Sequence, residues 1–127
     1  LAATTLTARA DEHAHHHDHA GSPLVASASH CIATANVCLA HCLDRLAEGD
    51  REMASCARSV TSLIAVCEGL MVLSAQHSPH LAHYAKVAAE VCKACEDECT
   101  KHAEHPPCKA CADACKACAA ECAKVAA

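Results

Sequence analysis

The sequence predicts an all-α fold, an antiparallel up-down-up-down four-helix bundle with a cysteine-lined core. The first observation is that 53% of the residues are hydrophobic although Tyr84 is the sole aromatic residue. The core must therefore be filled by Ala, Leu, Val and Cys, and Ala and Leu are good helix formers. The second observation is that 13 cysteines recur mostly at intervals of three and four residues, which places them on one face of a helix. A chain of 127 residues is expected to form one domain.

The chain divides into two expected regions. Residues 1–22 show no helical apolar stripe and are predicted to be a flexible, histidine-rich N-terminal tail. The tail histidines are His13, His15, His16, His17 and His19. The chain does not begin with Met, and Ala8-Arg9-Ala10 has the small-x-small form of a signal-peptidase site, so residues to Ala10 are a possible signal-peptide remnant. Residues 23–127 are expected to form the bundle.

The first predicted helix runs from near Leu24 to Ala47. Its apolar face repeats at steps of three and four through Leu24, Ala28, Cys31, Ala35, Cys38 and Cys42. Gly49 follows at the position that a helix C-terminal cap prefers. Asp50 is expected to cap the second helix. The inward face of that helix contains Met53, Cys56, Val60, Leu63, Cys67 and Leu70.

His77-Ser78-Pro79 interrupts the second helix, and Ser78 is expected to cap the third helix with Pro79 as its first residue. The inward face of the third helix contains Leu81, Ala85, Ala88, Cys92, Cys95, Cys99 and His102. Pro106-Pro107 is expected to open the fourth helix, which continues to Val125. Its thiols are Cys108, Cys111, Cys115, Cys118 and Cys122.

Short connections between four antiparallel helices determine which residues share each end of the bundle. One end should combine thiols with other metal-binding side chains, and we call it the mouth. Its expected members are Cys42, Cys56, Cys99, Cys108, His41, Met53, His102 and His105. The opposite end should be an apolar plug with one thiol, made of Leu24, Ala28, Leu70, Leu73, Leu81, Ala85 and Cys122.

The spacing of the cysteines favours metal binding over disulfide formation. Residues three or four apart on a helix have Cβ atoms roughly 5 to 6 Å apart, whereas a disulfide requires about 3.8 Å. Two thiolates on a near-linear ion lie about 4.5 Å apart, which side-chain rotation can supply. Thiolates select Cu(I), Zn(II) or iron–sulfur clusters. The odd cysteine count also prevents complete pairing within the chain.

Charge favours Cu(I) among these ions. A zinc ion bound by four thiolates leaves a charge of about −2, which is costly to bury. One Cu(I) per thiolate replaces one proton and leaves the core neutral. The sequence thus predicts multiple Cu(I) ions per chain, roughly one per cysteine. A zinc-binding, metallothionein-like buffer and a disulfide-stapled secreted helical protein are the alternatives.

Composition argues against several other functions. The net charge of −5 provides no basic stripe for nucleic acid. We expect no membrane span, because no uninterrupted apolar run reaches the roughly 20 residues that one requires. We expect no enzymatic activity, because equivalent thiols on one seam lack the single activated nucleophile of covalent catalysis.

Several segments together resemble the bacterial copper storage proteins, in particular the exported type of methane-oxidising bacteria. They are the His30-Cys31 pair, the stretch Cys38-Leu39-Ala40-His41-Cys42, and the cysteine series from Cys108 to Cys122. The resemblance covers about Ser27 to the C-terminus. It implies a four-helix bundle, a homotetramer, Cu(I) held by cysteines along the interior, and export to the periplasm by the twin-arginine route. A cytoplasmic location is the alternative, and the copper donor and recipient proteins are unknown.

The resemblance assigns metal ligands residue by residue. Core ligands are Cys31, Cys38, Cys42, Cys56, Cys67, Cys92, Cys95, Cys99, Cys108, Cys111, Cys115, Cys118 and Cys122. His41 and Met53 are the expected mouth ligands. Arg45 and Glu48 stand where relatives could carry a thioether, so this mouth is poorer in methionine.

Some of these residues have simpler structural interpretations. Cys31 or Cys67 alone could be packing filler, His41 could be a solvated helix-end residue, and Met53 could serve only packing. His102 and His105 are expected to be surface groups, and the tail histidines to be inert or to bind copper adventitiously. The leucines off the thiol seam and the single tyrosine are expected to make core or oligomer contacts. These residues are Leu39, Leu43, Leu46 and Tyr84.

Overall fold

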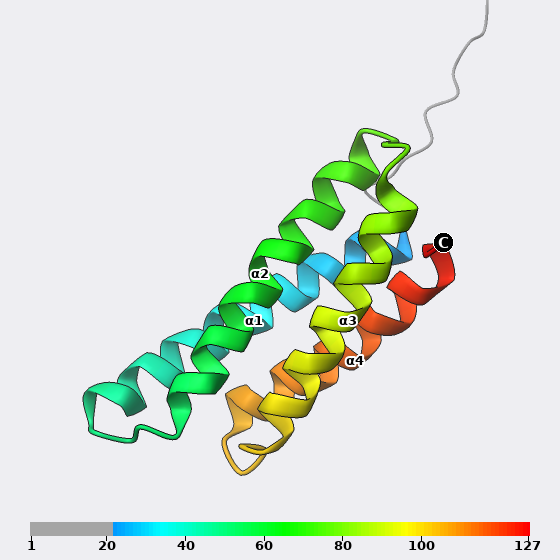
Figure 1. The fold of residues 1–127 in the computed structure, drawn as a ribbon. Coiled ribbons are helices and arrows are strands. Elements are labelled where there is room, and N and C mark those ends of the chain that lie inside the picture. The colour runs from blue at the N-terminus through cyan, green and yellow to red at the C-terminus, as the bar shows by residue number, and fades with distance from the viewer. Residues whose placement is uncertain (1–21) are drawn as a thin grey trace, which may run out of the picture.

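The computed structural model describes residues 22–127 and contains four α-helices in that part of the chain (Figure 1). They are α1 (Pro23–Ala47), α2 (Met53–Ala75), α3 (Leu81–Thr100) and α4 (Pro106–Val125). Within the described residues every regular element is helical, which confirms the predicted all-α bundle. The tail histidines and the Ala8-Arg9-Ala10 site lie outside the described residues.

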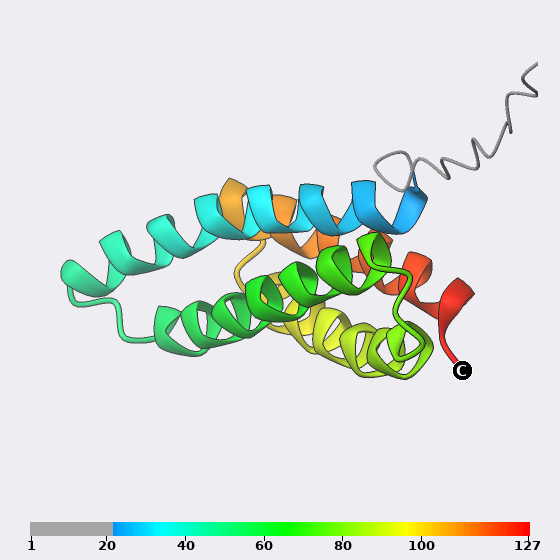
Figure 2. The same cartoon turned by 90° about the horizontal axis from the view of Figure 1, so that it is seen from above.

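The helices form a four-cornered antiparallel bundle. Helix α1 packs against α2 and α4, and α3 packs against the same two neighbours, while the backbones of the diagonal pairs of described helices lie farther apart. The α1–α2 and α3–α4 connections lie at the same end of the bundle, as Figures 1 and 2 show. The inward faces of all four helices therefore surround one common axis.

Helix α1 begins and ends close to the predicted positions. The Ser22 hydroxyl accepts a hydrogen bond from the Val25 backbone N–H at 3.1 Å, and Pro23 occupies the first turn. Such a cap satisfies one of the backbone donors that a helix N-terminus leaves free. After the helix, Gly49 adopts a φ of +94°, a left-handed conformation that glycine adopts without steric cost.

The predicted cap of α2 is wrong. Asp50 does not cap this helix, which begins at Met53 and has Glu52 at the capping position without a side-chain hydrogen bond. The Asp50 carboxylate instead accepts hydrogen bonds from Arg45 Nη2 at 3.1 Å and Nε at 3.3 Å. The fork of the guanidinium fits a carboxylate well, so this ion pair organises the connection between the two helices.

The predicted start of α3 is also wrong by two residues. Ser78 and Pro79 lie in a turn, and the helix begins at Leu81. The Ser78 hydroxyl accepts a hydrogen bond from the His80 backbone N–H at 3.2 Å, so the serine closes the turn instead of capping the helix. At the other end α3 stops at Thr100, which places His102 in the following turn. Helix α4 begins at Pro106 and ends at Val125, as predicted.

The core is made of thiols and small aliphatic side chains. All thirteen cysteines are 0% exposed. The larger aliphatic side chains that are fully buried beside them, Val60, Leu63 and Leu70, come from α2. Toward the plug end, Tyr84 lies across Gly69, where a Cβ atom would overlap the tyrosine hydroxyl. This close approach explains why α2 contains a glycine at position 69, although glycine is unfavourable within a helix.

The leucines off the thiol seam separate into two groups. Leu39 and Leu46 are partly buried against the core, as is Tyr84, whereas Leu43 is 55% exposed. Leu39, Leu46 and Tyr84 therefore make core contacts. Leu43 joins Val37, Val72 and Val87 as exposed apolar residues on the outside of the bundle.

Helices α1 and α2 are long and apolar enough to cross a membrane, by length and composition alone. Helices that line the core of a globular bundle satisfy the same criterion, so this is weak evidence. Both helices direct their cysteine faces into the bundle. The absence of a membrane span stays a prediction.

Candidate metal centre

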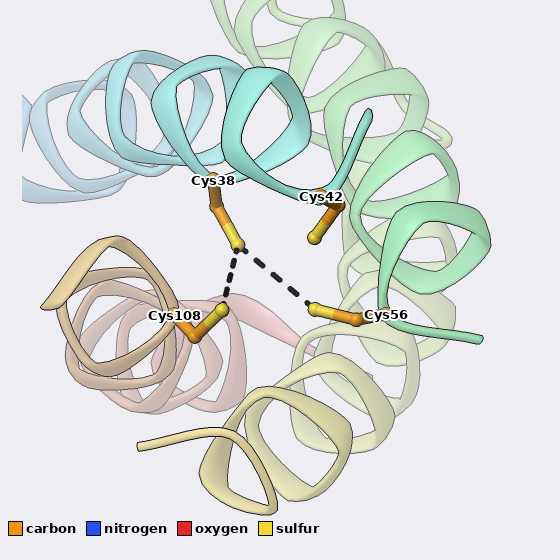
Figure 3. A group of neighbouring side chains, drawn as sticks. All are labelled: Cys38, Cys42, Cys56 and Cys108. Atoms are coloured by element: carbon orange, nitrogen blue, oxygen red, sulfur yellow. Dashed lines mark hydrogen bonds between the residues drawn. The ribbon is translucent and has the colours of Figure 1, made fainter. Parts of the chain in front are cut away.

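Four thiols meet at the mouth, contributed by three helices. Cys38 and Cys42 come from one face of α1, Cys56 from the first turn of α2, and Cys108 from the first turn of α4. Their sulfur atoms all lie within 4.8 Å of one another. Cys38 Sγ lies 3.9 Å from Cys56 Sγ and 3.8 Å from Cys108 Sγ (Figure 3). We call these four residues the mouth group.

The remaining thiols form groups of three with the same spacing. These groups are Cys38–Cys99–Cys111, Cys95–Cys111–Cys115, Cys31–Cys67–Cys118 and Cys92–Cys118–Cys122. With the mouth group they include all thirteen cysteines. Cys38, Cys111 and Cys118 each belong to two groups, so neighbouring groups share a sulfur atom.

Contacts between the groups make the thiols continuous along the bundle axis. Cys99 Sγ lies 3.8 Å from both Cys56 Sγ and Cys95 Sγ. Cys31 interacts with Cys115, which joins the mouth half of the interior to the half that ends at Cys122. We call this continuous arrangement of thirteen thiols the sulfur column.

Both ends of the column agree with the topology predicted from the sequence. Cys42, Cys56 and Cys108 meet at the mouth, and Cys99 contacts Cys56. At the opposite end Leu24, Ala28, Leu70 and Ala85 are buried, whereas Leu73 and Leu81 are only partly so. The plug is thus apolar inside. It borders a surface depression lined by Leu24, Ser74, Leu81, Glu121 and Lys124, among others.

Burial keeps two of the mouth thiols, Cys42 and Cys108, protonated in the absence of metal, whereas hydrogen bonds from neighbouring thiols, Cys111 first, lower the pKa of Cys38. Burial, followed by the hydrogen bond with Cys56, raises the pKa of Cys42. Burial, followed by the negative charges of Cys38 and Cys56, raises the pKa of Cys108. Deeper in the column, the hydrogen bond from Cys115 is the largest influence that lowers the pKa of Cys31 to about 5. Thiols that donate to a neighbouring sulfur stabilise its thiolate form.

His41 lies beside the mouth group with a free ligand atom. Its Nε2 is buried and has no hydrogen-bond partner among the described residues. The His41 ring packs against His105, with 4.8 Å between ring centroids. A buried nitrogen without a partner is unfavourable, so this atom is available for a metal ion or a thiolate.

The other candidate mouth residues have structural partners. Met53 is 1% exposed and packs in the core. His102, expected at the surface, is only 12% exposed, and its Nε2 lies 3.7 Å from Glu98 Oε1. His105 is also partly buried, at 24%. Arg45 pairs with Glu48 and Asp50 at 3.1 Å.

Thirteen buried thiols in shared groups suit a soft metal ion. Thiolate ligands select Cu(I), zinc or iron–sulfur clusters, and a sulfur atom that belongs to two groups can bridge two ions. Sulfur separations of 3.8 to 3.9 Å far exceed the roughly 2.05 Å of a disulfide bond. The arrangement provides several neighbouring thiol groups along one axis.

Known proteins are similar to this chain in sequence and in fold. The profile of the family described as Csp, copper storage protein, matches residues 17–127. An "uncharacterized cysteine-rich protein YhjQ" of Bacillus subtilis is 31% identical over 81 residues, which cover 64% of this chain and 72% of that protein.

Two solved structures have the same fold. The "Cu(I)-bound Copper Storage Protein BsCsp3" matches with a TM-score of 0.75 and 29% identity, covering 82% of this chain and 95% of that chain. The apo form of copper storage protein 3 from Bacillus subtilis matches with a TM-score of 0.74 and 30% identity, over 83% and 97% of the two chains. With its column of buried thiols, the chain therefore belongs to the copper storage protein family and functions as a copper storage protein.

Proposed function

We propose that residues 23–127 store copper as Cu(I), with about one ion per cysteine and all thirteen cysteines as ligands. The observation that carries this proposal is the sharing of Cys38, Cys111 and Cys118 between neighbouring thiol groups. Shared sulfur atoms allow each thiolate to bridge two ions, so the number of ions can approach the number of thiols. A structural neighbour is described as Cu(I)-bound, which supports the same ion here.

Charge balance supports Cu(I) over zinc in the interior of the column. Each Cu(I) that replaces a thiol proton adds no net charge. The column of fully buried cysteines therefore stays neutral as it fills with ions. Zinc in four-thiolate sites would accumulate negative charge there, and buried uncompensated charge is strongly unfavourable. A filled Cu(I) column avoids that cost.

We further propose that His41 and Met53 guide ions into the column. His41 has a buried ring nitrogen without a partner within the described structure, and Met53 occupies the first turn of α2 at the same end. Imidazole and thioether groups bind Cu(I) without a proton to release at neutral pH. These two side chains therefore suit the transfer of Cu(I) into the column better than its permanent retention at the mouth.

The partners and location of the protein follow from the family resemblance. We propose storage without catalysis, exchange with copper donor and acceptor proteins, and no binding to nucleic acid, given the net charge of −5. Residues 1–22 are proposed to be a separate histidine-rich segment. We also propose export to the periplasm and a homotetramer, to which the exposed Val37, Val72 and Val87 offer apolar surface. Cell fractionation and sedimentation equilibrium of the purified chain test these two assignments.

The capacity of the column is tested by removing three thiols of α4. Replacing Cys111, Cys115 and Cys118 with Ala should lower Cu(I) capacity by about three ions per chain if each thiolate accounts for one. Alanine favours helix, so circular dichroism should remain that of the wild type. The measurement is an anaerobic Cu(I) titration against a chromogenic chelator. A matched control replaces the exposed Lys109 and Lys116 of α4 with Ala; unchanged capacity in the triple cysteine variant would refute the shared column.

The mouth ligands are tested by loading kinetics. The variant His41→Ala, Met53→Leu should load Cu(I) several-fold more slowly than the wild type, because entry loses its transfer ligands, and should reach the same capacity. Stopped-flow mixing with a Cu(I)–chelator complex measures the rate. The control variant His80→Ala, Met71→Leu changes the same residue types away from the mouth and should load at the wild-type rate. Equal rates in both variants, or a large loss of capacity in the first, would contradict this role.

Alkaline pH should destabilise the metal-free protein through the mouth thiols. Unfolded cysteine titrates near pH 8.5, whereas the folded protein holds the protons of Cys42 and Cys108 to higher pH. The stabilisation from these two thiols is therefore complete below about pH 8.5 and declines as pH rises above it. Thermal unfolding from pH 7 to 10 should show a smaller decline in the variant Cys42→Ala, Cys108→Ala. Parallel curves for the variant and the wild type would show that these thiols do not contribute.

A further inference from the structure

We propose that the mouth group, Cys38, Cys42, Cys56 and Cys108, is also a tetrahedral binding site for one divalent zinc ion. Among the described thiol groups it is the one that offers four sulfur atoms, since each of the others offers three. Structural zinc sites in proteins almost always have four ligands in a tetrahedron. The proposal concerns an additional ion and does not depend on the Cu(I) stoichiometry proposed above.

The distances between the sulfur atoms fit a zinc site. With Zn–S bonds of about 2.3 Å, the sulfur atoms at the corners of a regular tetrahedron lie about 3.8 Å apart. Cys38 Sγ lies 3.8 Å from Cys108 Sγ and 3.9 Å from Cys56 Sγ. The whole group falls within 4.8 Å, and Figure 3 shows all four sulfur atoms directed into one space. Little rearrangement is therefore needed to enclose an ion.

The position of the mouth group lessens the charge problem that disfavours zinc deeper in the column. A four-thiolate zinc site has a charge of about −2, which requires nearby donors or cations. His41 precedes Cys42, and His105 lies one turn before Cys108, so two imidazoles accompany the group. The Nε2 of His41 has no hydrogen-bond partner among the described residues, so this imidazole is not committed to another group. For the interior groups no histidine contact is recorded among the described residues, and Cys95 has a hydrogen bond with the Ser59 hydroxyl instead.

Zinc at the mouth would occupy the entrance of the unfilled column. Thiolates bind Cu(I) more tightly than zinc, so entering Cu(I) would take over the thiolates and release Zn²⁺. This exchange is a ligand substitution in which no electron is transferred. The site would thus close the column with a labile ion until copper arrives.

The test uses the reduced, metal-free full chain and titrates it anaerobically with Zn²⁺ and with Co²⁺ as a spectroscopic probe. We expect one tight equivalent per chain, with sulfur-to-cobalt charge transfer and the intense visible bands of tetrahedral cobalt. Cys42→Ala should weaken Zn²⁺ binding more than about 100-fold, a larger effect than the loss of a second-shell partner. Cys122→Ala is the matched control, because Cys122 is equally buried but lies in a three-thiol group at the other end; its zinc affinity should equal that of the wild type.

Several outcomes would overturn the proposal. Cobalt spectra without sulfur charge transfer would place the ion on imidazoles, three or four tight zinc ions per chain would indicate a general zinc buffer, and equal weakening by both variants would exclude a mouth site. Cys108→Ala, checked by circular dichroism, gives a second test if Cys42→Ala fails to fold. Adding Cu(I) to the zinc-loaded wild type should release one Zn²⁺ per chain, and retention of zinc would exclude the proposed exchange. Cu(I) capacity measured on the same variants separates this proposal from the storage function.

Discussion

The burial of thirteen thiols on one axis is the constraint on which the rest of the structure depends. Each helix presents its sulfur atoms on the inward face, which fixes the spacing of three and four residues or their multiples. Cysteine is small, so the helices approach closely and leave no room for aromatic rings, and the single tyrosine packs outside the column against Gly69. Stability therefore depends on the aliphatic residues of α2, such as Leu63 and Leu70, and on the apolar plug.

Much of this structure can be predicted from the sequence because the thiol pattern is strictly helical. The repeat of cysteines at three and four residues identifies the inward face of each helix. Pro106 marks a helix start and Gly49 follows a helix end, because the backbone preferences of proline and glycine depend only on the residue itself. The roles of Asp50 and Ser78 are harder to predict, because each side chain can accept hydrogen bonds from several nearby donors. Asp50 accepts from the Arg45 guanidinium and Ser78 accepts from a backbone N–H of its turn, and neither caps a helix.

Contacts between helices could not be predicted from the spacing alone. Which thiols share a group depends on the axial offset and rotation of neighbouring helices, and these are set by packing. The pairing of His41 with His105 and the double membership of Cys38, Cys111 and Cys118 therefore emerge only in three dimensions. The position of both histidines within one turn of a mouth cysteine was the available signal for their proximity.

The closed plug at one end and the mouth at the other have a consequence for the order of events inside the bundle. The sulfur column follows one axis, and neighbouring thiol groups are joined through shared sulfur atoms. For exchange through the mouth, an ion at Cys122 must pass the groups nearer Cys42 before it leaves. Copper exchanged through the mouth would follow a last-in, first-out order. The first ion to arrive would be the last to depart, and the depth of an ion in the column would reflect its time of arrival.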